Sequence, residues 1–405
     1  MSSILYVCPS FAIDTPGDFI YDLIKEFTDN GHILTVIIPT ERRNNEKTHI
    51  EIYSGYRVVK IWTLNYRGKV SLLEKGFSTL LMGYLVRKAL RKFCKKDVFA
   101  LSIFQTLPIT YRPAIRYLKS KKSFIYLLHK DIFPQSAIDL GIFSSQSFSY
   151  RLFRLIEKRL YSICDMIGVM TEKNASYILE QNPELNKSKV EVCPNALLPF
   201  QENCIRKMKL EQKKIREKYD IPHDKVVFVY GGNISRAQGI SFIEQVVKNI
   251  DSIEKTFLLF IGSGNEFVRL KSIIEINNIS NAMIINFLPK AEYDQLVSAC
   301  DVGLVFLDYR FTIANIPSRT LAYINLGLPV VAATDNFTDY RDIIEENKIG
   351  LWSPSNDIGK FLSNIDYFSK NPERIIEYGS NARAYLHSAA NVKIPYNIII
   401  KHISL

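Results

Sequence analysis

The chain has 405 residues, 47% of them hydrophobic and 23% charged, and its formal net charge is +11. This length exceeds one ordinary hydrophobic core and predicts two or three domains, and the composition excludes a disordered or low-complexity protein. No run of about 18 apolar residues predicts a transmembrane helix, and the start MSSILYVCPSF lacks the basic and apolar regions of an export signal.

The six cysteines and six histidines are dispersed along the chain, without a C-x-x-C pair. This spacing argues against zinc ribbons, disulfide frameworks and other metal clusters. It predicts mostly buried thiols, as in a cytosolic protein.

Short apolar runs recur along the whole chain, and each is followed by a helical pattern. Continuous Val, Ile, Leu and Phe runs of this kind predict strands buried on both faces of parallel sheets, and their alternation with helices predicts βαβ units. The expected strands are 4–10, 34–40, 56–62, 98–105, 123–129, 166–171, 190–195, 225–232, 256–264, 282–288, 302–308 and 330–334.

A charged stretch at 201–225 interrupts this series, and the strand–loop–helix pattern then starts afresh. The sequence therefore predicts an α/β protein of two Rossmann-like domains, 1–200 and 201–385, that face each other across a cleft. The last segment, 386–405, is expected to return to the first domain. In doubly wound sheets ligands bind beyond the carboxyl ends of the strands, so functional residues are sought there.

The loop PSFAIDTPGD (9–18), which contains Gly17, follows the first expected strand and precedes a helix. It is a candidate for the floor of the cleft, and an ordinary structural turn is the alternative.

Positive charge is concentrated in residues 51–130, which hold 17 Lys and Arg but three Asp and Glu. This asymmetry predicts a polyanionic partner such as anionic lipid, phosphate or nucleic acid, and a solvated basic surface without a partner is the alternative. No recognised nucleic-acid-binding motif accompanies the charge, so nucleic acid is not expected as a partner.

The segment 77–96 within this region predicts a basic amphipathic helix. Such a helix can lie on an anionic membrane surface; alternatively, it packs its apolar side on the core and leaves the basic side in water. Its apolar side comprises Met82, Leu85, Val86, Ala89, Leu90 and Phe93, and its basic side comprises Arg87, Lys88, Arg91, Lys92, Lys95 and Lys96.

The segment HKDIFPQSAIDLG (129–141) directly follows an expected strand. Asp131 lies at the strand's carboxyl end, where it could accept a hydroxyl proton or bind sugar hydroxyls. An aspartate that only caps the following turn is the alternative.

The loop GGNISRAQG (231–239) lies between a strand and a helix. Its glycines allow close approach of an anion, the helix N-terminus offers free N–H groups, and Arg236 adds a charged fork suited to a diphosphate. A tight turn with an exposed arginine is the alternative. The loop GSGNE (262–266), with Gly264, is a weaker signal of the same kind.

Pro317 and Ser318 precede another expected helix, which Ser318 could cap. Arg319 lies in its first turn, where a cation opposes the helix dipole. A local conflict of this kind indicates a functional demand, such as a donor phosphate, and an exposed surface arginine is the alternative.

Taken together, these blocks resemble the family 4 glycosyltransferases of the GT-B fold, and most of all the subgroup that acts in bacterial surface polysaccharide synthesis. The resemblance covers nearly the whole chain, in the family's order. It is carried by DIFPQSAIDLGIF, FRLIEKRLYSICDMIGVMTEKNASYIL, VEVCPNAL, GGNISRAQGI, and IPSR with GLPVVA.

The resemblance implies a retaining hexosyltransferase that uses a nucleotide-diphosphate sugar, usually a UDP-sugar, without a metal or other cofactor. Positive side chains and a helix N-terminus then stabilise the leaving diphosphate. The implied acceptor is a lipid-diphosphate-linked saccharide at the cytoplasmic face of the membrane, in capsule, O-antigen or exopolysaccharide assembly. The enzyme would be cytoplasmic and peripheral to that membrane.

Position by position, the resemblance implies a donor-side set and an acceptor-side pair. Arg319 replaces the family's more usual lysine and keeps its charge, and no catalytic nucleophile is assigned. The donor-side set takes Asn233, Arg236, Gln238 and Arg319 from the resemblance, and Gly232, Gly264 and Ser318 from the loops described above. Arg236 and Arg319, with Asp131, are the candidate catalytic residues. Gly17 would lie near donor and acceptor, and Asp131 in the acceptor-side block.

Two departures from the family pattern are expected to matter. The family's two glutamates, eight positions apart, correspond to Ala314 and Ala322, and the second normally holds the donor ribose. Gln238 also stands where a lysine is common. A non-catalytic GT-B protein that acts as a partner or membrane-binding subunit, or a nucleotide-sugar epimerase, is therefore an alternative to the transferase.

Overall fold

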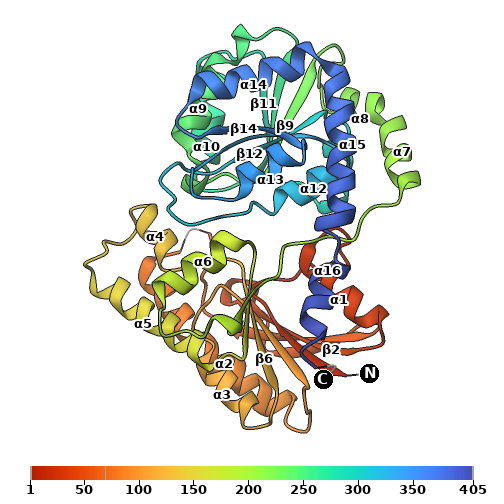
Figure 1. The fold of residues 1–405 in the computed structure, drawn as a ribbon. Coiled ribbons are helices and arrows are strands. Elements are labelled where there is room, and N and C mark those ends of the chain that lie inside the picture. Colours follow the sequence, from red (N-terminus) through yellow and green to blue (C-terminus); the bar gives the residue numbers. More distant parts are fainter. Residues whose placement is uncertain (1, 69, 404–405) are drawn as a thin grey trace. The chain divides into compact units, whose positions relative to one another are not determined.

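The computed structural model describes residues 2–68 and 70–403 (Figure 1). These form two compact units, one ending at Ala196 and resuming at Val392, and the other spanning Leu197–Asn391. The sequence predicted domain boundaries at residues 200 and 385, each a few residues from the point where the chain passes from one unit to the other. Each unit is built on its own largely parallel sheet, so the predicted α/β class and the two Rossmann-like domains are confirmed.

The N-terminal unit has an eight-stranded sheet in the order β3-β4-β2-β1-β5-β6-β7-β8, parallel except for β3 beside β4. Its strands are β1 Ser3–Val7, β2 Ile33–Glu41, β3 His49–Ile52, β4 Tyr56–Thr63, β5 Leu101–Gln105, β6 Phe124–His129, β7 Met166–Val169 and β8 Val190–Val192. Its helices are α1 Phe19–Asp29, α2 Leu72–Phe93, α3 Arg112–Lys119, α4 Gln135–Asp139, α5 Phe148–Ile163, α6 Glu172–Gln181 and α16 Lys393–Ile400, with short 3-10 turns at Arg42–Asn44 and Lys187–Lys189.

Different helices cover the two faces of this sheet. Helices α2, α3, α5 and α6 contribute to the core on one face, and α1 and α16 to the core on the other. The C-terminal segment is held in this unit by Glu191, whose carboxylate accepts from Tyr126 Oη at 3.0 Å and pairs with Lys401 Nζ at 2.7 Å and His402 Nε2 at 2.8 Å.

The structure corrects the expectation for the apolar side of the basic helix. In α2, Met82, Val86, Ala89 and Leu90 are buried in the core on one face of the sheet, and Leu85 and Phe93 pack against them. These side chains cannot also enter a membrane, because burial in the core already removes them from water. None of the helices in the described part of the chain has the length and hydropathy needed to span a bilayer.

The C-terminal unit has a six-stranded, fully parallel sheet in the order β11-β10-β9-β12-β13-β14. Its strands are β9 Val226–Asn233, β10 Thr256–Ser263, β11 Ala282–Ile285, β12 Val302–Phe306, β13 Val330–Thr334 and β14 Gly350–Pro354. Its helices are α7 Glu202–Leu210, α8 Gln212–Lys218, α9 Ile240–Asn249, α10 Phe267–Ile276, α11 Lys290–Ser298, α12 Arg319–Asn325, α13 Tyr340–Glu346, α14 Ile358–Lys370 and α15 Pro372–Ala389, with 3-10 turns at Arg236–Gln238 (η3) and Ile250–Ser252.

Helices α9, α10 and α14 form one core against this sheet, and α12 packs against β12, β13 and α15. The structure has a strand at each of the twelve positions expected from the sequence. Strands β3 and β14 were not expected. Five of the six cysteines are buried, Cys204 is exposed, and all are free thiols.

Candidate functional site

The C-terminal sheet reverses its strand order between β9 and β12, and ligands of doubly wound folds bind at such a switch point. The carboxyl end of β9 carries Gly231, Gly232 and Asn233. The loop after β9 touches the loop after β12, because the Asp308 amide donates to the Ala237 carbonyl at 2.9 Å. Several predicted site residues are therefore gathered at one edge of one sheet.

Three glycines let β9 and β10 run close together at this edge. A Cβ on Gly262 would lie 1.9 Å from the Gly232 carbonyl oxygen, and one on Gly264 would lie 2.1 Å from that of Ile234. Gly232 and Gly264 also have φ angles of +128° and +152°, which disfavour any other residue. The backbone thus requires both predicted glycines, and a ligand contact remains a prediction.

Arg319 is the most unusual side chain at the switch point. Its guanidinium carbon lies 4.3 Å from the centroid of the Tyr230 ring, and 3.6 Å from the place where a Cβ on Gly232 would stand. Its Nη1 atom is buried and has no hydrogen-bond partner among the described residues. An unpaired buried donor costs about 1–3 kcal/mol, so this geometry suits an anion that would accept the free N–H.

Ser318 precedes Arg319, but it does not cap the helix as expected. The residue has helical backbone angles, with φ −60° and ψ −23°, and its side chain makes no capping hydrogen bond. A capping serine needs extended angles to turn its hydroxyl back onto the first turn. The side chain is instead exposed at the rim of the switch point.

Three tyrosines that the sequence analysis missed fix the end of β9. The Tyr323 hydroxyl accepts from the Gly231 amide at 2.9 Å, and the Tyr230 hydroxyl donates to the Asn233 carbonyl at 2.6 Å. A Cβ on Gly231 would lie 1.9 Å from the Tyr293 hydroxyl. Tyr323 follows Arg319 by four residues on one helical face, and this spacing was the available sequence signal.

Arg236 lies in η3 with an exposed side chain, and its Nε is 3.4 Å from Glu266 Oε1. The Glu266 carboxylate is mostly buried, and its other oxygen lies 3.5 Å from Arg269 Nη1. An ion pair with one exposed partner contributes little to stability. Arg236 therefore keeps the freedom to turn toward a different anion.

Gln238 has a structural role that the sequence analysis did not anticipate. Its amide oxygen accepts from the Ser235 amide at 3.1 Å and from the Ser235 hydroxyl at 2.6 Å, which closes a capping box over η3. Gly239 follows in the left-handed conformation, with φ +66°. The Asn233 side chain, by contrast, is exposed beside the same turn.

The structure also shows what surrounds the two alanines at the glutamate positions. Ala314 is buried and Ala322 is half-buried. On the same loop, Asp308 is held by Arg310, whose Nε and Nη2 lie 2.8 and 2.9 Å from its two oxygens. That carboxylate is thus already paired.

The N-terminal sheet reverses its order between β1 and β5, and two predicted residues lie in this unit. Gly17 has φ +79°, and its amide donates to Asp22 Oδ1 at 3.1 Å. Asp131 follows β6 with its side chain exposed, and its amide donates to Thr106 Oγ1 at 3.2 Å. Burial lowers the pKa of the neighbouring Lys130 to about 8.

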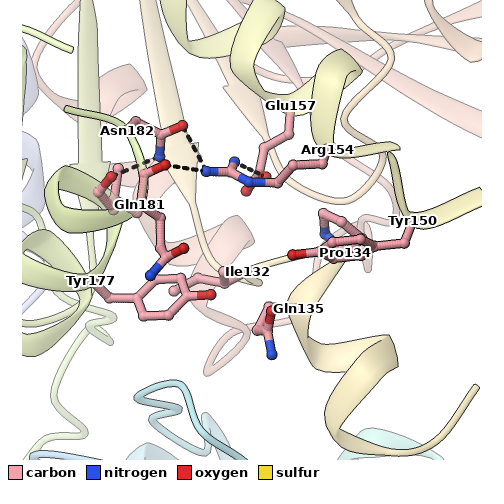
Figure 2. A pocket seen from close by; sticks show the side chains of 10 residues that line it. Ile132, Pro134, Gln135, Tyr150, Arg154, Glu157, Tyr177, Gln181 and Asn182 are labelled. Carbon is pink, nitrogen blue, oxygen red and sulfur yellow. Dashed lines mark hydrogen bonds and ion pairs between the residues drawn. The ribbon is translucent and has the colours of Figure 1, made fainter. Parts of the chain in front are cut away.

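A buried chain of polar groups links the end of β6 to Glu157, which lines a small pocket between α5 and α6. Figure 2 shows that pocket, with Glu157, Arg154 and Asn182 among its lining residues. His129 Nε2 lies 2.7 Å from the Tyr161 hydroxyl, which donates to Glu157 Oε1 at 2.5 Å. Glu157 pairs with Arg154, which also donates to Asn182 Oδ1 at 2.9 Å. Burial lowers the pKa of His129 to about 3, so the imidazole is neutral. Because Tyr161 donates its hydroxyl proton to Glu157, the His129 Nε2 N–H donates to the Tyr161 oxygen.

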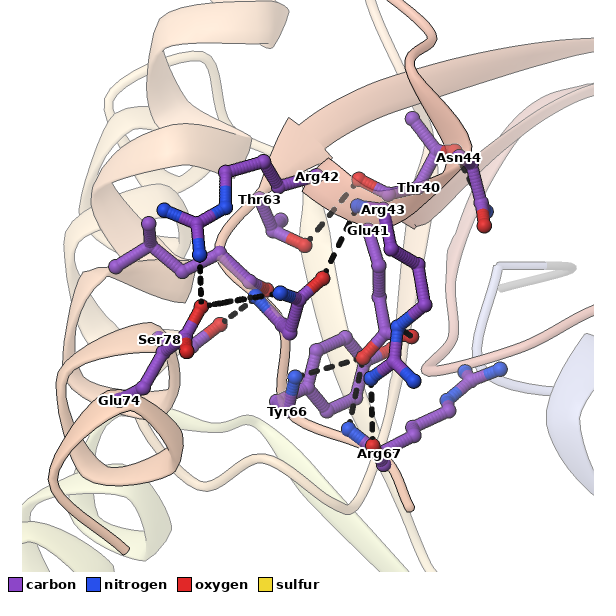
Figure 3. A network of polar contacts seen from close by, with 12 residues as sticks. Thr40, Glu41, Arg42, Arg43, Asn44, Thr63, Tyr66, Arg67, Glu74 and Ser78 are labelled. Atoms are coloured by element: carbon purple, nitrogen blue, oxygen red, sulfur yellow. Dashed lines mark hydrogen bonds and ion pairs between the residues drawn. The ribbon is translucent and has the colours of Figure 1, made fainter. Parts of the chain in front are cut away.

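A second polar network ties the loop after β4 to its surroundings (Figure 3). Glu41 Oε1 accepts from the amides of Tyr66 and Arg67 at 2.6 and 2.7 Å. The Tyr66 hydroxyl donates to the Pro9 carbonyl at 2.8 Å, and Glu74 in the first turn of α2 pairs with Arg42 at 3.2 Å. The start of α2 and the loop after β1 are therefore held to the same part of the N-terminal unit.

The described residues contain no group of three or more His, Cys, Asp or Glu side chains that could hold a metal ion. Arg236 and Arg319 are positive groups at the C-terminal switch point, where a third arginine, Arg310, is already paired with Asp308. Two guanidinium groups beside glycine backbone at this edge have a charge and geometry suited to an anion, and their role as a site remains a prediction.

Much of the chain is similar in sequence to known glycosyltransferases. Residues 211–385 match the family described as glycosyl transferases group 1. The chain is 25% identical over 294 residues to the probable glycosyltransferase WbjE of Pseudomonas aeruginosa, which covers 71% of this chain and 70% of that protein. It is 26% identical over 136 residues to the putative colanic acid biosynthesis glycosyl transferase WcaI of Escherichia coli K12, which covers 32% of each.

Among solved structures, the fold is similar to that of Anabaena Alr3699/HepE in complex with UDP and glucose. The TM-score is 0.71 with 13% sequence identity, and the match covers 100% of both chains. This likeness concerns the fold alone.

Proposed function

We propose that this chain, which is a glycosyltransferase with the GT-B fold, transfers a hexosyl group with retention from a UDP-sugar to a lipid-diphosphate-linked saccharide. The proposed setting is surface polysaccharide biosynthesis, at the cytoplasmic face of the membrane. The C-terminal unit would bind the donor, and the N-terminal unit would supply acceptor-side residues, including Asp131 and Gly17.

The observation that carries this proposal is the geometry of Arg319. A guanidinium stacked on Tyr230 and lying against Gly232 stands where a doubly wound sheet binds phosphates. Its buried Nη1 has no hydrogen-bond partner among the described residues. A donor diphosphate would accept that hydrogen bond, and Arg236 could swing from Glu266 to add a second charge.

The proposed reaction breaks the bond between the sugar C1 and the donor phosphate oxygen, and the electron pair leaves with UDP. The acceptor hydroxyl oxygen forms the new bond to C1 on the face from which UDP leaves, so the configuration at C1 is retained, and its proton passes to Asp131. The cations of Arg236 and Arg319 would balance the charge that develops on the diphosphate, which is the role a metal ion has in other phosphate chemistry. No metal is required in this scheme.

The choice of donor base and pathway rests on the relatives. UDP is bound by the fold neighbour Alr3699/HepE, and the relative WcaI is named for colanic acid biosynthesis. The excess of positive charge in residues 51–130 fits an acceptor that carries diphosphate and lies at an anionic membrane.

The test is a transfer assay with the purified protein, membrane lipid extract and labelled UDP-sugars, in the presence of a chelator. We expect label to enter the lipid fraction, and we expect Arg319→Ala and Asp131→Asn to reduce it strongly. The matched control is Arg341→Ala, because Arg341 also stacks on an aromatic ring, 5.0 Å from Trp352, but lies beside the edge strand β14. Equal losses in Arg319→Ala and Arg341→Ala would contradict the proposal.

Ala314 and Ala322 give the same assay further outcomes. Without the carboxylate that the resemblance places on the donor ribose, we expect modest donor affinity, which Ala322→Glu should raise. Donor binding with no transfer to any lipid fraction would instead support a non-catalytic GT-B protein. A changed sugar in the absence of acceptor would support an epimerase.

A further inference from the structure

Helix α2 carries a second apolar stripe that the sequence analysis missed. Leu73, Phe77, Leu81 and Tyr84 are 78%, 61%, 43% and 59% exposed. Together with Leu80 they recur at spacings of three and four, so they share one helical face. This outer face is distinct from the side that buries Met82 and its neighbours in the core. Large apolar side chains gathered in this way on the surface indicate an interaction site.

The outer face of α2 continues as a basic surface in its C-terminal half. Lys88 and Arg91 follow Tyr84 at spacings of four and three, and Lys92 lies beside them. Lys95 stands in the turn just after the helix, and all four side chains are exposed. None of these four cations forms an ion pair among the residues that the structure describes. One face of one helix is therefore apolar in its first half and basic in its second.

The acidic groups of this region are already engaged elsewhere. Of the three carboxylates in residues 51–130, Glu51 pairs with Lys60 at 2.7 Å, Glu74 with Arg42 at 3.2 Å, and Asp97 with Arg57. They cannot neutralise the outer face of α2, because their partners hold them. The positive charge is left for an external anion.

The neighbouring helices on the same side of the sheet are also basic. The pKa of Arg112 in α3 is lowered by burial and by the nearby charges of Arg116 and Arg159. The Nε atoms of Arg87 and Arg112 are buried without a hydrogen-bond partner among the described residues. This layer thus presents mutually repelling cations, which a surface of negative charge would relieve.

A groove between β4 and α2 adjoins the outer face. Its lining combines the apolar side chains Trp62, Leu85 and Phe93 with Lys88 and Lys92. An apolar lining beside two ammonium groups fits one amphiphile with an anionic head. A soluble acidic protein would satisfy the lysines but would leave the apolar stripe and the groove without a partner.

From these features we infer that the outer face of α2 docks on a lipid bilayer that contains anionic phospholipid. Leu73, Phe77, Leu81 and Tyr84 enter the boundary between headgroups and acyl chains, and Lys88 to Lys95 contact lipid phosphates. This inference rests on the proposed function, since a lipid-linked acceptor requires the enzyme to work at a membrane. It names the surface that makes this contact.

The test is flotation of the full chain with vesicles of phosphatidylethanolamine and phosphatidylglycerol, compared with phosphatidylcholine alone. The wild type should bind the anionic vesicles, less so at high salt, and should not bind the neutral ones. Phe77→Ser with Leu81→Ser should lower the partition coefficient about tenfold or more for each side chain. Lys88→Gln with Lys95→Gln should remove most of the salt dependence.

Two matched controls lie on other surfaces. Val268 and Ile276 of α10 are 71% and 78% exposed, so Val268→Ser with Ile276→Ser changes apolar area by a similar amount. Lys207→Gln with Lys209→Gln, in α7, removes two exposed charges. Both controls should float like the wild type. Unchanged flotation of the α2 variants, equal losses in the controls, or no binding of the wild type would overturn the inference.

Failure of the inference can be separated from failure of the proposed function. If transfer to the lipid fraction fails while flotation depends on Phe77 and Leu81 as described, the proposed function falls and the docking surface stands. If Phe77→Ser with Leu81→Ser transfers sugar into lipid vesicles as fast as the wild type, the docking surface falls and the transferase stands.

Discussion

Replacing Arg319 by methionine should separate its cost to the fold from its value to the site. Methionine keeps an apolar stem against Tyr230 but removes the guanidinium. The fold loses a cation–π contact of about 0.5–2 kcal/mol and is relieved of an unpaired buried donor that costs about 1–3 kcal/mol. The two effects largely offset each other, so the unfolding free energy without ligand should fall by no more than about 1 kcal/mol and rise by no more than about 2.5 kcal/mol.

Donor binding should respond quite differently. A hydrogen bond from a charged group is worth about 1.5–3 kcal/mol, so Arg319→Met should weaken UDP binding by roughly 10- to 150-fold. Thermal unfolding with and without UDP measures both quantities, because a unit of this size shifts its melting temperature by about 2–4 °C per kcal/mol. Arg341→Met is the control for a stacked arginine elsewhere in the unit.

The reasoning about Arg319 would be refuted by the opposite pattern. A fall in melting temperature of well over about 8 °C without ligand, together with an unchanged response to UDP, would make Arg319 a structural residue. The unpaired Nη1 would then have no functional meaning.

Three further predictions concern packing and charge. Gly83→Ala in α2 should destabilise the N-terminal unit by about 1–3 kcal/mol in denaturant titration, because the Cβ would lie 2.0 Å from the Thr110 carbonyl oxygen. Gly76→Ala in the same helix meets nothing within 4 Å and should stabilise the unit by up to about 1 kcal/mol. Equal effects of the two substitutions would contradict the packing of α2. Gly262→Ala should misplace the end of β9, since its Cβ would lie 1.9 Å from a carbonyl oxygen there, and UDP affinity should fall with it in calorimetry. Burial lowers the pKa of His129 to about 3 in the folded chain, against about 6.5 in the unfolded chain. Between these pH values the unfolded chain binds more protons, so the unfolding free energy should fall as pH drops, by up to about 1.4 kcal/mol per pH unit. His129→Gln should flatten this slope in thermal melts from pH 4 to 7.

Much of the fold could be predicted because strands buried on both faces of a parallel sheet have continuous apolar sequences. The run VVFVY in β9 and the run VVAA in β13 are examples, and both are fully within the core sheet. Strand β3 (HIEI) is a short antiparallel edge strand with no fully buried position, and β14 (GLWSP) includes a glycine and a proline among its five residues. Neither has the apolar continuity on which the prediction depended.

Site residues could be predicted where a side chain is unfavourable for its local structure. They could not be predicted where contacts between separate elements determine which side chains meet. Arg319 stood out because a cation in a first helical turn is locally unfavourable. The tyrosines that surround it come from three separate elements, and only the folded sheet brings them together. Ser318 was expected as a cap from its type alone, but its helical backbone angles rule that out.

Tertiary contacts also decide which face of α2 meets the sheet, and the sequence alone does not show this. Its hydrophobic residues form two stripes, one with Met82 and Val86 and one with Phe77 and Leu81. Periodicity shows that each stripe shares a face, but it does not show which face meets the sheet. The sequence left open whether the stripe with Met82 and Val86 meets a membrane or the core, and the structure places it in the core, with Phe77 and Leu81 exposed.

The most direct test of the central claim is calorimetric titration of the wild-type protein with UDP, GDP and their common sugars, in buffer with a metal chelator. The account predicts that UDP and at least one UDP-sugar bind without metal and raise the melting temperature, with about 2.7 kcal/mol of stabilisation at a hundredfold excess over Kd. Binding of no nucleotide by a well-folded sample, or binding that requires a divalent metal, would contradict a donor site built on Arg236 and Arg319.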